Sequence, residues 1–273
     1  MNSVAAPDLS QLKSVLKSTW IAGDFGQVAR HTAVTAQEFI DRTPIQPGMR
    51  VLDIACGTGN TAIPAAKTGA QVTGIDIAPN LLAQARDWAS RENLTIRFDE
   101  GDAEELPYPD QSFDVVLTMF GAMFAPRPDR VAAEILRVCK PGGHIAMANW
   151  TPQGFVGKSF QVTAKIAPPP PGIQPPVLWG EENVVRQRFG SGVSHLTTTK
   201  QLAQFSYPYD AKGMVDFFRK YFGPTQSAFA RLDESGQAAL AAQLEALWKE
   251  HNTATDGGTR VAAEYLDVHA TKA

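Results

Sequence analysis

The fold of this chain is decided by the stretch Val51-Leu52-Asp53-Ile54-Ala55-Cys56-Gly57-Thr58-Gly59-Asn60. An apolar strand pattern that contains one acidic residue gives way to a turn with two glycines, and a helix pattern follows. Gly57 and Gly59 allow the backbone to bend sharply and to come close to a bound molecule. The first N–H groups of the following helix face the same place. The stretch therefore predicts a ligand-binding turn between a strand and a helix.

Two kinds of ligand fit such a turn. Dinucleotides bind at a similar loop, which here would read Gly57-x-Gly59-x-x-Ala62. A carboxylate beside the turn, however, repels a pyrophosphate and suits a ligand with an ammonium or a sulfonium group. S-adenosyl-L-methionine (SAM) carries both groups, so Asp53 favours SAM over a nicotinamide dinucleotide.

The length and composition are those of an ordinary globular protein. The chain has 273 residues, of which 44% are hydrophobic and 19% are charged, and this fits a single domain over residues 1–273. The net charge of −3, without a strongly basic stretch, argues against a nucleic-acid partner. No apolar run is long enough to cross a bilayer, and residues 1–8 lack the pattern of a signal peptide.

The two cysteines, Cys56 and Cys139, form no disulfide framework and no metal-ligand spacing. We therefore expect no metal site and a reducing, cytoplasmic location. Cys56 lies in the ligand-binding turn, where we interpret it as a small apolar residue and not as a nucleophile.

Strand and helix patterns alternate through the first half of the chain. Five strands are expected at residues 49–54, 71–77, 94–99, 113–119 and 144–150. Helices are expected at residues 10–22, 27–40, 60–68, 79–91 and 129–139. Continuous apolar strands that alternate with helices predict a parallel sheet covered on both faces. Ligands of such sheets bind at the carboxyl ends of the strands.

The pattern changes after Trp150. Residues 152–194 are rich in proline and glycine, and the run at 168–171 favours a polyproline conformation. This segment is either a surface connection or a cap inserted over the site. Further on, we expect strands at 196–207 and 261–269 and helices at 211–222 and 236–251.

Acidic residues follow two more strands. Asp76 ends the second strand, where a carboxylate can accept both hydroxyls of a ribose, although an aspartate before Pro79 also suits a helix start. Asp102 follows the third strand and can accept from the amine of an adenine, with turn formation as the alternative. The segment 118–124 after the fourth strand is apolar and lies at the same edge, so it forms either core or pocket wall.

Together these residues resemble the class I SAM-dependent methyltransferases, most closely the branch with the ubiquinone and menaquinone C-methyltransferases and related bacterial small-molecule enzymes. The resemblance covers about residues 48–150 and rests on segments 51–59, 72–79, 101–114 and 134–143, which occur in the family's order. It implies a Rossmann-like α/β fold with seven strands in the order 3-2-1-4-5-7-6. The strand at 261–269 would be the antiparallel one.

The resemblance also implies where SAM lies. The methionine end would contact the turn, the ribose and adenine would contact the ends of the second and third strands, and the sulfonium would lie near the fourth. A helical lid formed by residues 1–43 would close over the cofactor through Trp20. The implied cofactor residues are Trp20, Asp53, Ala55, Cys56, Gly57, Gly59, Asn60, Asp76, Ile77, Asp102, Ala103, Glu104, Thr118, Met119 and Phe120.

Methyl transfer from a sulfonium depends chiefly on holding the acceptor in line with the S–CH₃ bond, and some acceptors also need a general base. His31, His195 and Tyr207, and after them Asp24 and Tyr209, have the right chemistry for a base, but no motif supports any of them. A structural role is the alternative for each. No oligomeric state follows from the sequence.

The acceptor is expected to be a small molecule, and the methylated atom is left open. Aromatic residues after Trp150 either form an apolar pocket for an aromatic or quinone-like acceptor, or form core. They are Phe155, Phe160, Trp179, Phe189, Phe205, Tyr207, Phe217 and Phe218. Two other functions are compatible with the turn, namely a SAM-binding protein without catalysis and a nicotinamide-dependent oxidoreductase. Asp53 and the lack of a Tyr–Lys or Cys–His set argue against the oxidoreductase.

Overall fold

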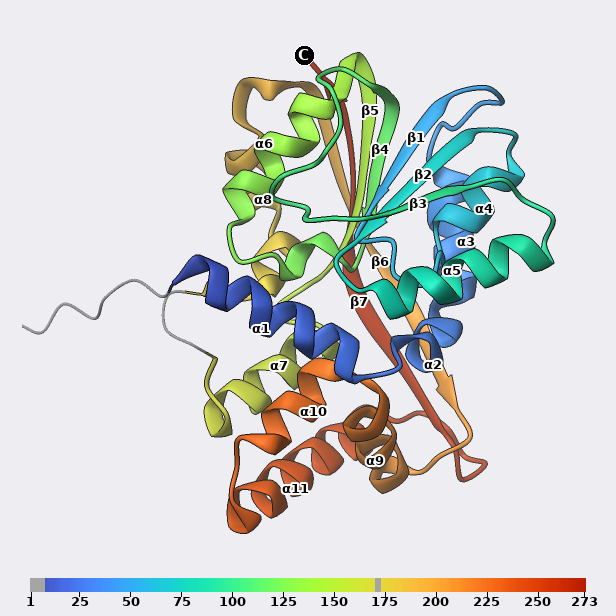
Figure 1. Cartoon of the computed structure of the whole chain (residues 1–273). Coiled ribbons are helices and arrows are strands. Elements are labelled where there is room, and N and C mark those ends of the chain that lie inside the picture. The colour runs from blue at the N-terminus through green and yellow to red at the C-terminus, as the bar shows by residue number, and fades with distance from the viewer. Residues whose placement is uncertain (1–7, 170–172) are drawn as a thin grey trace, which may run out of the picture.

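The computed structural model describes residues 8–169 and 173–273 (Figure 1). Within them a seven-stranded sheet has the order β3-β2-β1-β4-β5-β7-β6, which confirms the predicted topology. The strands β1 to β5 run parallel, and β7 lies antiparallel between β5 and β6. The strands are β1 Arg50–Ile54, β2 Gln71–Asp76, β3 Arg97–Glu100, β4 Phe113–Met119, β5 Cys139–Trp150, β6 Val193–Tyr207 and β7 Thr259–Lys272.

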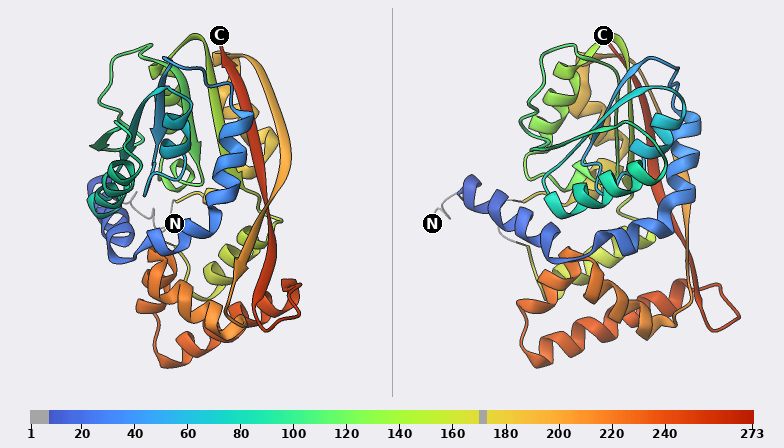
Figure 2. Two further views of the ribbon diagram at one scale, coloured as in Figure 1. Left: turned by 90° about the vertical axis from the view of Figure 1, so that its right-hand side faces the viewer. Right: turned by 45° about the vertical axis from the view of Figure 1, so that its right-hand side comes forward.

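Helices cover the sheet and build a cap below it. Figure 1 shows β6 and β7 continuing past the rest of the sheet to a group of helices at its carboxyl edge, with α1 between the two parts. The views in Figure 2 show the same arrangement. The α-helices are α1 Leu9–Ala22, α2 Phe25–Ala29, α3 Ala33–Arg42, α4 Ala62–Lys67, α5 Pro79–Arg91, α6 Pro128–Val138, α7 Phe155–Ile166, α8 Glu182–Phe189, α9 Ala211–Tyr221, α10 Gly223–Ala230 and α11 Glu234–His251.

Several helix starts follow from local chemistry. The carboxylate of Asp210 accepts the N–H of Gly213 at 2.8 Å before α9, and Asp233 accepts the N–H of Gly236 at 2.8 Å before α11. These bonds satisfy N–H groups that have no partner inside the helix. Pro79 occupies the first turn of α5, where its missing N–H costs nothing.

The expected helix at 27–40 is interrupted. A 3₁₀ turn, η1 Arg30–Thr32, separates α2 from α3. Apolar spacing did not reveal this break, because the spacing continues through it. The turn has consequences for the site, since it brings Ala29 and Thr32 to the wall of a cavity.

Other differences lie in the second half. Helices α7, α8 and α10 were not expected. The average composition of residues 152–194 hides the uninterrupted stretch of α7, and the prolines at 168 and 169 follow its end. The end of the proline run, residues 170 and 171, lies outside the described residues, as do residues 1–7.

Strand boundaries also differ. β6 begins at Val193 instead of residue 196, and β7 runs over Thr259–Lys272 instead of 261–269. β3 begins at Arg97 instead of residue 94, because Asn93 adopts a left-handed turn after α5 with φ of 55°. β5 begins at Cys139 instead of residue 144. Gly142 and its neighbours belong to the strand, where the pairing with β4 is irregular, and do not form a loop that precedes it. In the described residues, no helix has both the length and the apolar character that a membrane span requires.

Candidate functional site

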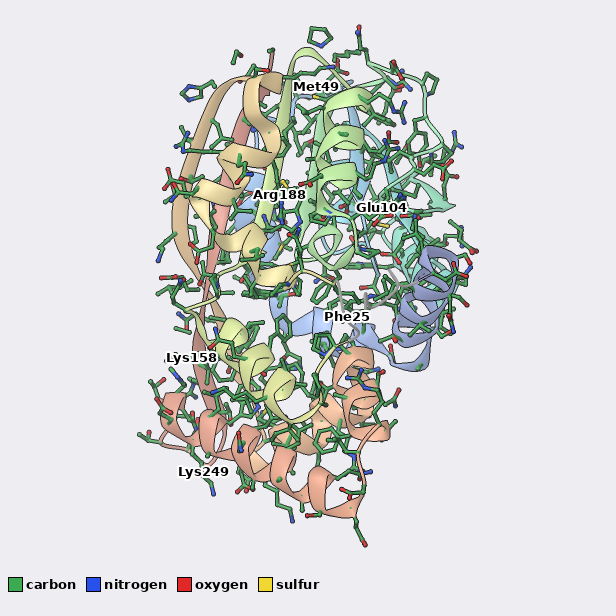
Figure 3. The ribbon with its side chains drawn as sticks, turned by 90° about the vertical axis from the view of Figure 1, so that its left-hand side faces the viewer. Phe25, Met49, Glu104, Lys158, Arg188 and Lys249 are labelled. Carbon is green, nitrogen blue, oxygen red and sulfur yellow. The ribbon has the colours of Figure 1, made fainter. Side chains whose placement is uncertain are left out.

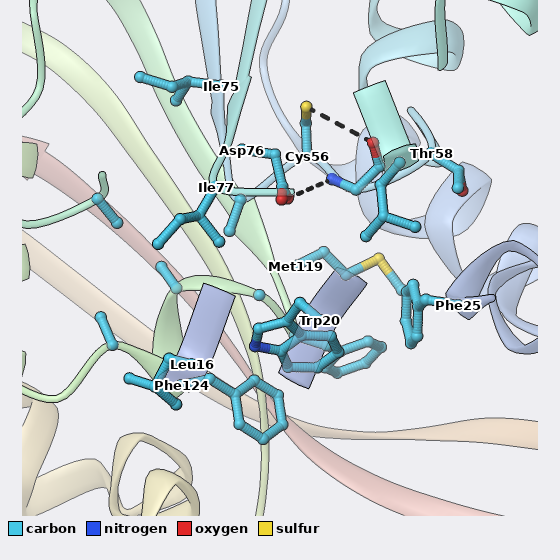
Figure 4. A pocket seen from close by; sticks show the side chains of 18 of the residues that line it. Leu16, Trp20, Phe25, Cys56, Thr58, Ile75, Asp76, Ile77, Met119 and Phe124 are labelled. Atoms are coloured by element: carbon cyan, nitrogen blue, oxygen red, sulfur yellow. Dashed lines mark hydrogen bonds between the residues drawn. The ribbon is translucent and has the colours of Figure 1, made fainter. Parts of the chain in front are cut away.

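The principal cavity opens at the carboxyl ends of β1, β2 and β4, as the topology predicts (Figure 4). It holds about 1060 Å³ of space free of protein atoms, open solvent at its mouth included, and is bounded by the ligand-binding turn, the ends of β2 and β4, and helix α1. Its wall contains most of the predicted cofactor residues: Trp20, Ala55, Cys56, Gly57, Asn60, Asp76, Ile77, Asp102, Ala103, Met119 and Phe120.

Two loops at this edge adopt an unusual backbone conformation. Ala55 after β1 and Phe120 after β4 have φ of 55° and 59°, values that side chains other than glycine rarely adopt. The loops touch at Gly121, where an added Cβ would lie 2.5 Å from the carbonyl oxygen of Ala55. Such conformations persist only where the surroundings enforce them, and they concentrate at functional sites.

Asp76 connects the end of β2 to the turn. One carboxylate oxygen accepts the N–H of Gly57 at 2.8 Å, drawn as a dashed line in Figure 4, and the other accepts the N–H of Ala78 at 2.9 Å. Burial raises the pKa of this carboxyl, while the N–H groups act to lower it. Each oxygen keeps a lone pair beyond the bond that it already accepts, so the carboxylate is able to receive the two hydroxyls of a ribose.

The remaining wall also fits SAM. Ile77 and Leu81 supply apolar surface next to Asp76 for an adenine ring. At Gly57 an added Cβ would meet only the ring of Phe25, at 3.8 Å, so the turn leaves space on the cavity side. Figure 4 shows Trp20 across the cavity from Asp76, below Met119.

Asp53 does not line the cavity, in contrast to the expectation. Its side chain is fully buried beneath the turn, where one oxygen accepts the hydroxyl of Thr61 at 2.6 Å. The other oxygen has no hydrogen-bond partner in the described residues. Burial raises the pKa of Asp53 to about 7. Because the turn lies between the Asp53 side chain and the cavity, this conformation does not allow the predicted direct contact with the methionine end of SAM.

The buried Asp53 predicts a pH dependence of stability. A carboxyl whose pKa rises on folding stabilises the protein most below its unfolded pKa, here about 3.8, and that contribution is lost as the pH rises through about 7. Asp53→Asn removes the titration, so the free energy of unfolding of the variant relative to wild type should rise between pH 5 and pH 8. Urea unfolding at both pH values measures this difference, and an equal difference at both would refute the assignment.

Asp102 and Glu104 are engaged by α1 and by the loop before α6. The amine of Lys13 pairs with Asp102 and lies 2.7 Å from Glu104. Glu104 also accepts the backbone N–H and the guanidinium of Arg127, at 2.6 and 2.8 Å. It is fully buried and outside the cavity wall. Glu104 thus holds α1 and the loop together, and Asp102 has Lys13 beside it at the predicted adenine edge.

Two further predicted residues support the wall from behind. Gly59, with φ of 90°, packs against Ile63 and Ala85. Thr118 is buried, and its hydroxyl oxygen accepts the N–H of Ala122 at 3.1 Å. Neither lines the cavity in the described structure.

Of the three residues considered as bases, His31 and Tyr207 lie in contact with each other and His195 lies far from them. His31 lies beside β6, where its Nδ1 is 3.0 Å from the carbonyl oxygen of Ser206 and its ring stacks on Tyr207 at 3.9 Å. Burial lowers the pKa of His31 and raises that of Tyr207. His195 is exposed near the start of β6, opposite the carboxyl edge. None of the three lines the cavity.

The two weaker proposals for a base also fail to reach the site. Asp24 accepts from the side chains of Gln27 and Gln84 at 2.9 and 3.0 Å. Tyr209 is 42% exposed and packs beside Phe217. The geometry gives these residues structural roles.

A second cavity adjoins the first on the side of the cap. It holds about 930 Å³ of space free of protein atoms, open solvent included, and is bordered by α7, α9, α10, α11 and the ends of β5 and β6. Figure 3 shows Phe25 between the sheet and the cap. The two cavities share the wall residues Trp20, Phe25, Thr32, Phe120 and Phe124.

Aromatic rings form most of the second wall. Phe120 stacks on Trp150 at 3.6 Å between ring centroids, and Trp20 contacts Phe124 edge to face at 5.1 Å. Of the aromatic residues that the sequence left open between core and pocket, the wall takes Phe155, Phe160, Phe205 and Phe218. The others, Trp179, Phe189, Tyr207 and Phe217, are buried elsewhere.

Sequence reasoning missed Lys13, Leu16 and Thr32 of the first cavity. Their helices lie far from the turn in sequence, and no short motif marks them. The break at η1 in particular has no signal in the spacing of apolar residues.

Comparison with known proteins identifies the family. Residues 52–147 match the model of a methyltransferase domain. An uncharacterized protein of Mycobacterium tuberculosis (strain ATCC 25618 / H37Rv) is 37% identical over 239 residues, which cover 86% of this chain and 85% of that protein. Demethylmenaquinone methyltransferase of Deinococcus radiodurans is 42% identical over 117 residues, covering 41% of this chain and 48% of that enzyme.

Solved structures agree at the level of the fold. The crystal structure of a putative methyltransferase from Bacillus halodurans C-125 superposes with a TM-score of 0.61 at 17% identity, covering 88% of this chain and 99% of that one. With the matched domain and the cavity at the carboxyl edge, these findings show that the chain belongs to the class I SAM-dependent methyltransferases, with S-adenosyl-L-methionine as its cofactor.

Proposed function

We propose that this enzyme methylates a small, uncharged, aromatic or quinone-like molecule that binds in the second cavity. The observation that carries the proposal is the wall shared by the two cavities. A cofactor at the carboxyl edge has its sulfonium next to that wall if it takes the orientation that the resemblance implies. An acceptor on the other side then lies close to the methyl group.

The chemistry of the second wall supports the class of acceptor. Among the described residues, its side chains are aromatic, aliphatic or hydroxyl-bearing, and none is charged. Burying an unpaired charge there would be costly, whereas flat rings pack favourably against aromatic side chains. A small neutral ring system therefore suits this wall better than a charged metabolite or a nucleic acid.

The reaction itself is a direct displacement. A lone pair of the acceptor forms the bond to the methyl carbon while the S–CH₃ bond breaks, and its electrons stay on sulfur to give S-adenosylhomocysteine (SAH). When the reacting atom carries a hydrogen, that proton passes to water. The two cavities adjoin at their shared lining residues, so reactants that meet at this junction gain proximity and orientation, the main contribution that such a reaction needs.

We infer that residues 8–43, the described part of the lid expected at 1–43, cover the cofactor, supported by the contributions of Lys13, Leu16 and Trp20 to the first cavity. We also infer a cytoplasmic location, supported by the two free, buried thiols. Cell fractionation with an antibody to the chain tests the location.

Binding of two matched probes tests the acceptor class. In calorimetry with SAH present, 2-methylnaphthalene should bind, and naphthalene-2-sulfonate should bind at least about tenfold more weakly because its charge must be buried. Equal affinities, or preference for the sulfonate, would contradict the proposal.

A variant locates the probe. Ser159 lies on α7 and lines only the second cavity, so Ser159→Phe should fill part of it and weaken 2-methylnaphthalene binding about tenfold or more. Ala164→Phe places the same ring on the exposed side of α7 and should bind the probe like wild type. SAH affinity should be the same in both variants. Normal probe binding by Ser159→Phe would place the acceptor elsewhere.

A further inference from the structure

Thr32 differs in chemistry from the other residues that line both cavities. Four of the five shared residues are Trp20 and the phenylalanines at 25, 120 and 124, and Thr32 is the fifth. Apart from the indole N–H of Trp20, it supplies the only polar side-chain group on the shared wall within residues 8–169 and 173–273. Under the proposed function, the methyl group passes between the cavities at the residues that line both, and Thr32 is one of them.

The backbone conformation at Thr32 brings this residue to the wall. Thr32 ends the 3₁₀ turn that interrupts the expected helix, and its φ and ψ of −109° and 7° lie outside the helical region. Short 3₁₀ turns within a helical stretch often mark functional positions. The residue is only 9% exposed, so its orientation is fixed by its surroundings.

Hydrogen bonds leave the hydroxyl with one free acceptor position. Thr32 Oγ1 donates to the carbonyl oxygen of Ala29 at 2.9 Å and accepts from Asn60 Nδ2 at 3.2 Å. A hydroxyl has one hydrogen and two lone pairs, so its hydrogen and one lone pair are used. Asn60 belongs to the cofactor-binding turn, which ties the orientation of the hydroxyl to the cofactor side.

We propose that Thr32 positions the reacting atom of the acceptor by accepting a hydrogen bond from its O–H or N–H group. The proposal rests on the proposed function and narrows the acceptor to a small aromatic molecule with a hydroxyl or amino group, on whose oxygen or nitrogen the methyl is placed. With its hydrogen directed at Thr32, that atom turns a lone pair toward the shared wall. The lone pair forms the new bond to carbon, the S–CH₃ electrons stay on sulfur, and the proton passes to water.

Two probes and two variants test this role. 2-Naphthol and 2-methylnaphthalene differ by a hydroxyl in place of a methyl group. In calorimetry with SAH present, Thr32→Val should weaken 2-naphthol binding about three- to tenfold, the loss of one hydrogen bond, and should leave 2-methylnaphthalene within about twofold. Thr32→Ser keeps the hydroxyl and should restore the affinity for 2-naphthol.

Thr32 also lines the first cavity, so each variant is first titrated with SAH and the probes are then compared at saturating SAH. The carbonyl oxygen of Ala29 keeps the N–H of Asn60, at 2.7 Å, when the threonine hydroxyl is lost, and the matched control is 2-methylnaphthalene, which makes no hydrogen bond. Unchanged binding of 2-naphthol by Thr32→Val, or equal weakening of both probes, would overturn the positioning role. If wild type binds neither naphthalene, the proposed acceptor class itself fails, and this inference fails with it.

Discussion

Asp76→Ala is expected to weaken the binding of SAM and SAH at least about 100-fold, because two hydrogen bonds between a carboxylate and the ribose hydroxyls are lost. The variant also loses the acceptor for the N–H groups of Gly57 and Ala78, so the turn itself becomes less well held. Calorimetric titration with SAH measures the effect, and circular dichroism shows whether the variant is folded.

A second carboxylate of the same sheet provides the control for Asp76. Asp99 on β3 accepts the hydroxyl of Tyr108 at 3.0 Å and pairs with Arg97 at 2.8 Å, and it does not line the first cavity. Asp99→Ala should bind SAH with wild-type affinity. If Asp76→Ala is folded and binds SAH as tightly as Asp99→Ala does, the ribose assignment is wrong. Asp76→Asn, which keeps the size of the side chain, should be weakened as well.

Gly121→Ala is expected to impair both stability and cofactor binding. Its new Cβ would lie 2.5 Å from the carbonyl oxygen and 2.6 Å from the Cβ of Ala55. Neither loop can yield easily, because Ala55 and Phe120 already hold left-handed conformations. Overpacking of this kind costs about 1–3 kcal/mol, and separation of the two loops should reduce SAH affinity about tenfold or more.

Gly142→Ala is the matched control for this clash. Gly142 lies in the irregular part of β5, where an added Cβ meets nothing within 4 Å, and its φ is 72°. In Gly142→Ala the free energy of unfolding should fall by only about 1 kcal/mol, because alanine must adopt a left-handed backbone conformation. Its affinity for SAH should equal that of wild type. Urea unfolding measures the stability of both variants, and SAH titration measures their affinity for the cofactor product. Wild-type SAH binding by Gly121→Ala would show that contact between the two loops does not shape the cofactor cavity.

The first half of the fold was predictable because its physics is local. Apolar strands, the glycine turn at residues 57–59 and Pro79 at a helix start each carry their own signal. The order of all seven strands came from the resemblance and is confirmed. Helices α7, α8 and α10 escaped prediction, because tertiary packing stabilises them and no local pattern marks them. The packing lies in the cap for α7 and α10, and against α6 and β6 for α8. The break at Arg30–Thr32 escaped because the apolar spacing continues through it.

The site was predictable where it follows strand ends. Asp76 and Ile77 line the cavity because consecutive parallel strands end at one edge. Asp53 and Glu104 have the expected positions in the chain, but their side chains point away from the cavity, and sequence spacing does not fix such directions. Thr32 required the three-dimensional structure, since it reaches the wall only through the 3₁₀ turn.

The central claim is that the methyl group passes from the first cavity to the second where the two adjoin. A crystal structure of the enzyme with SAH and 2-naphthol tests it most directly. The account predicts the SAH sulfur in the first cavity next to Phe120, the naphthol ring among the aromatic side chains of the second cavity, and the naphthol oxygen beside Thr32. A naphthol bound outside the second cavity, or an SAH sulfur directed away from the shared wall, would contradict it.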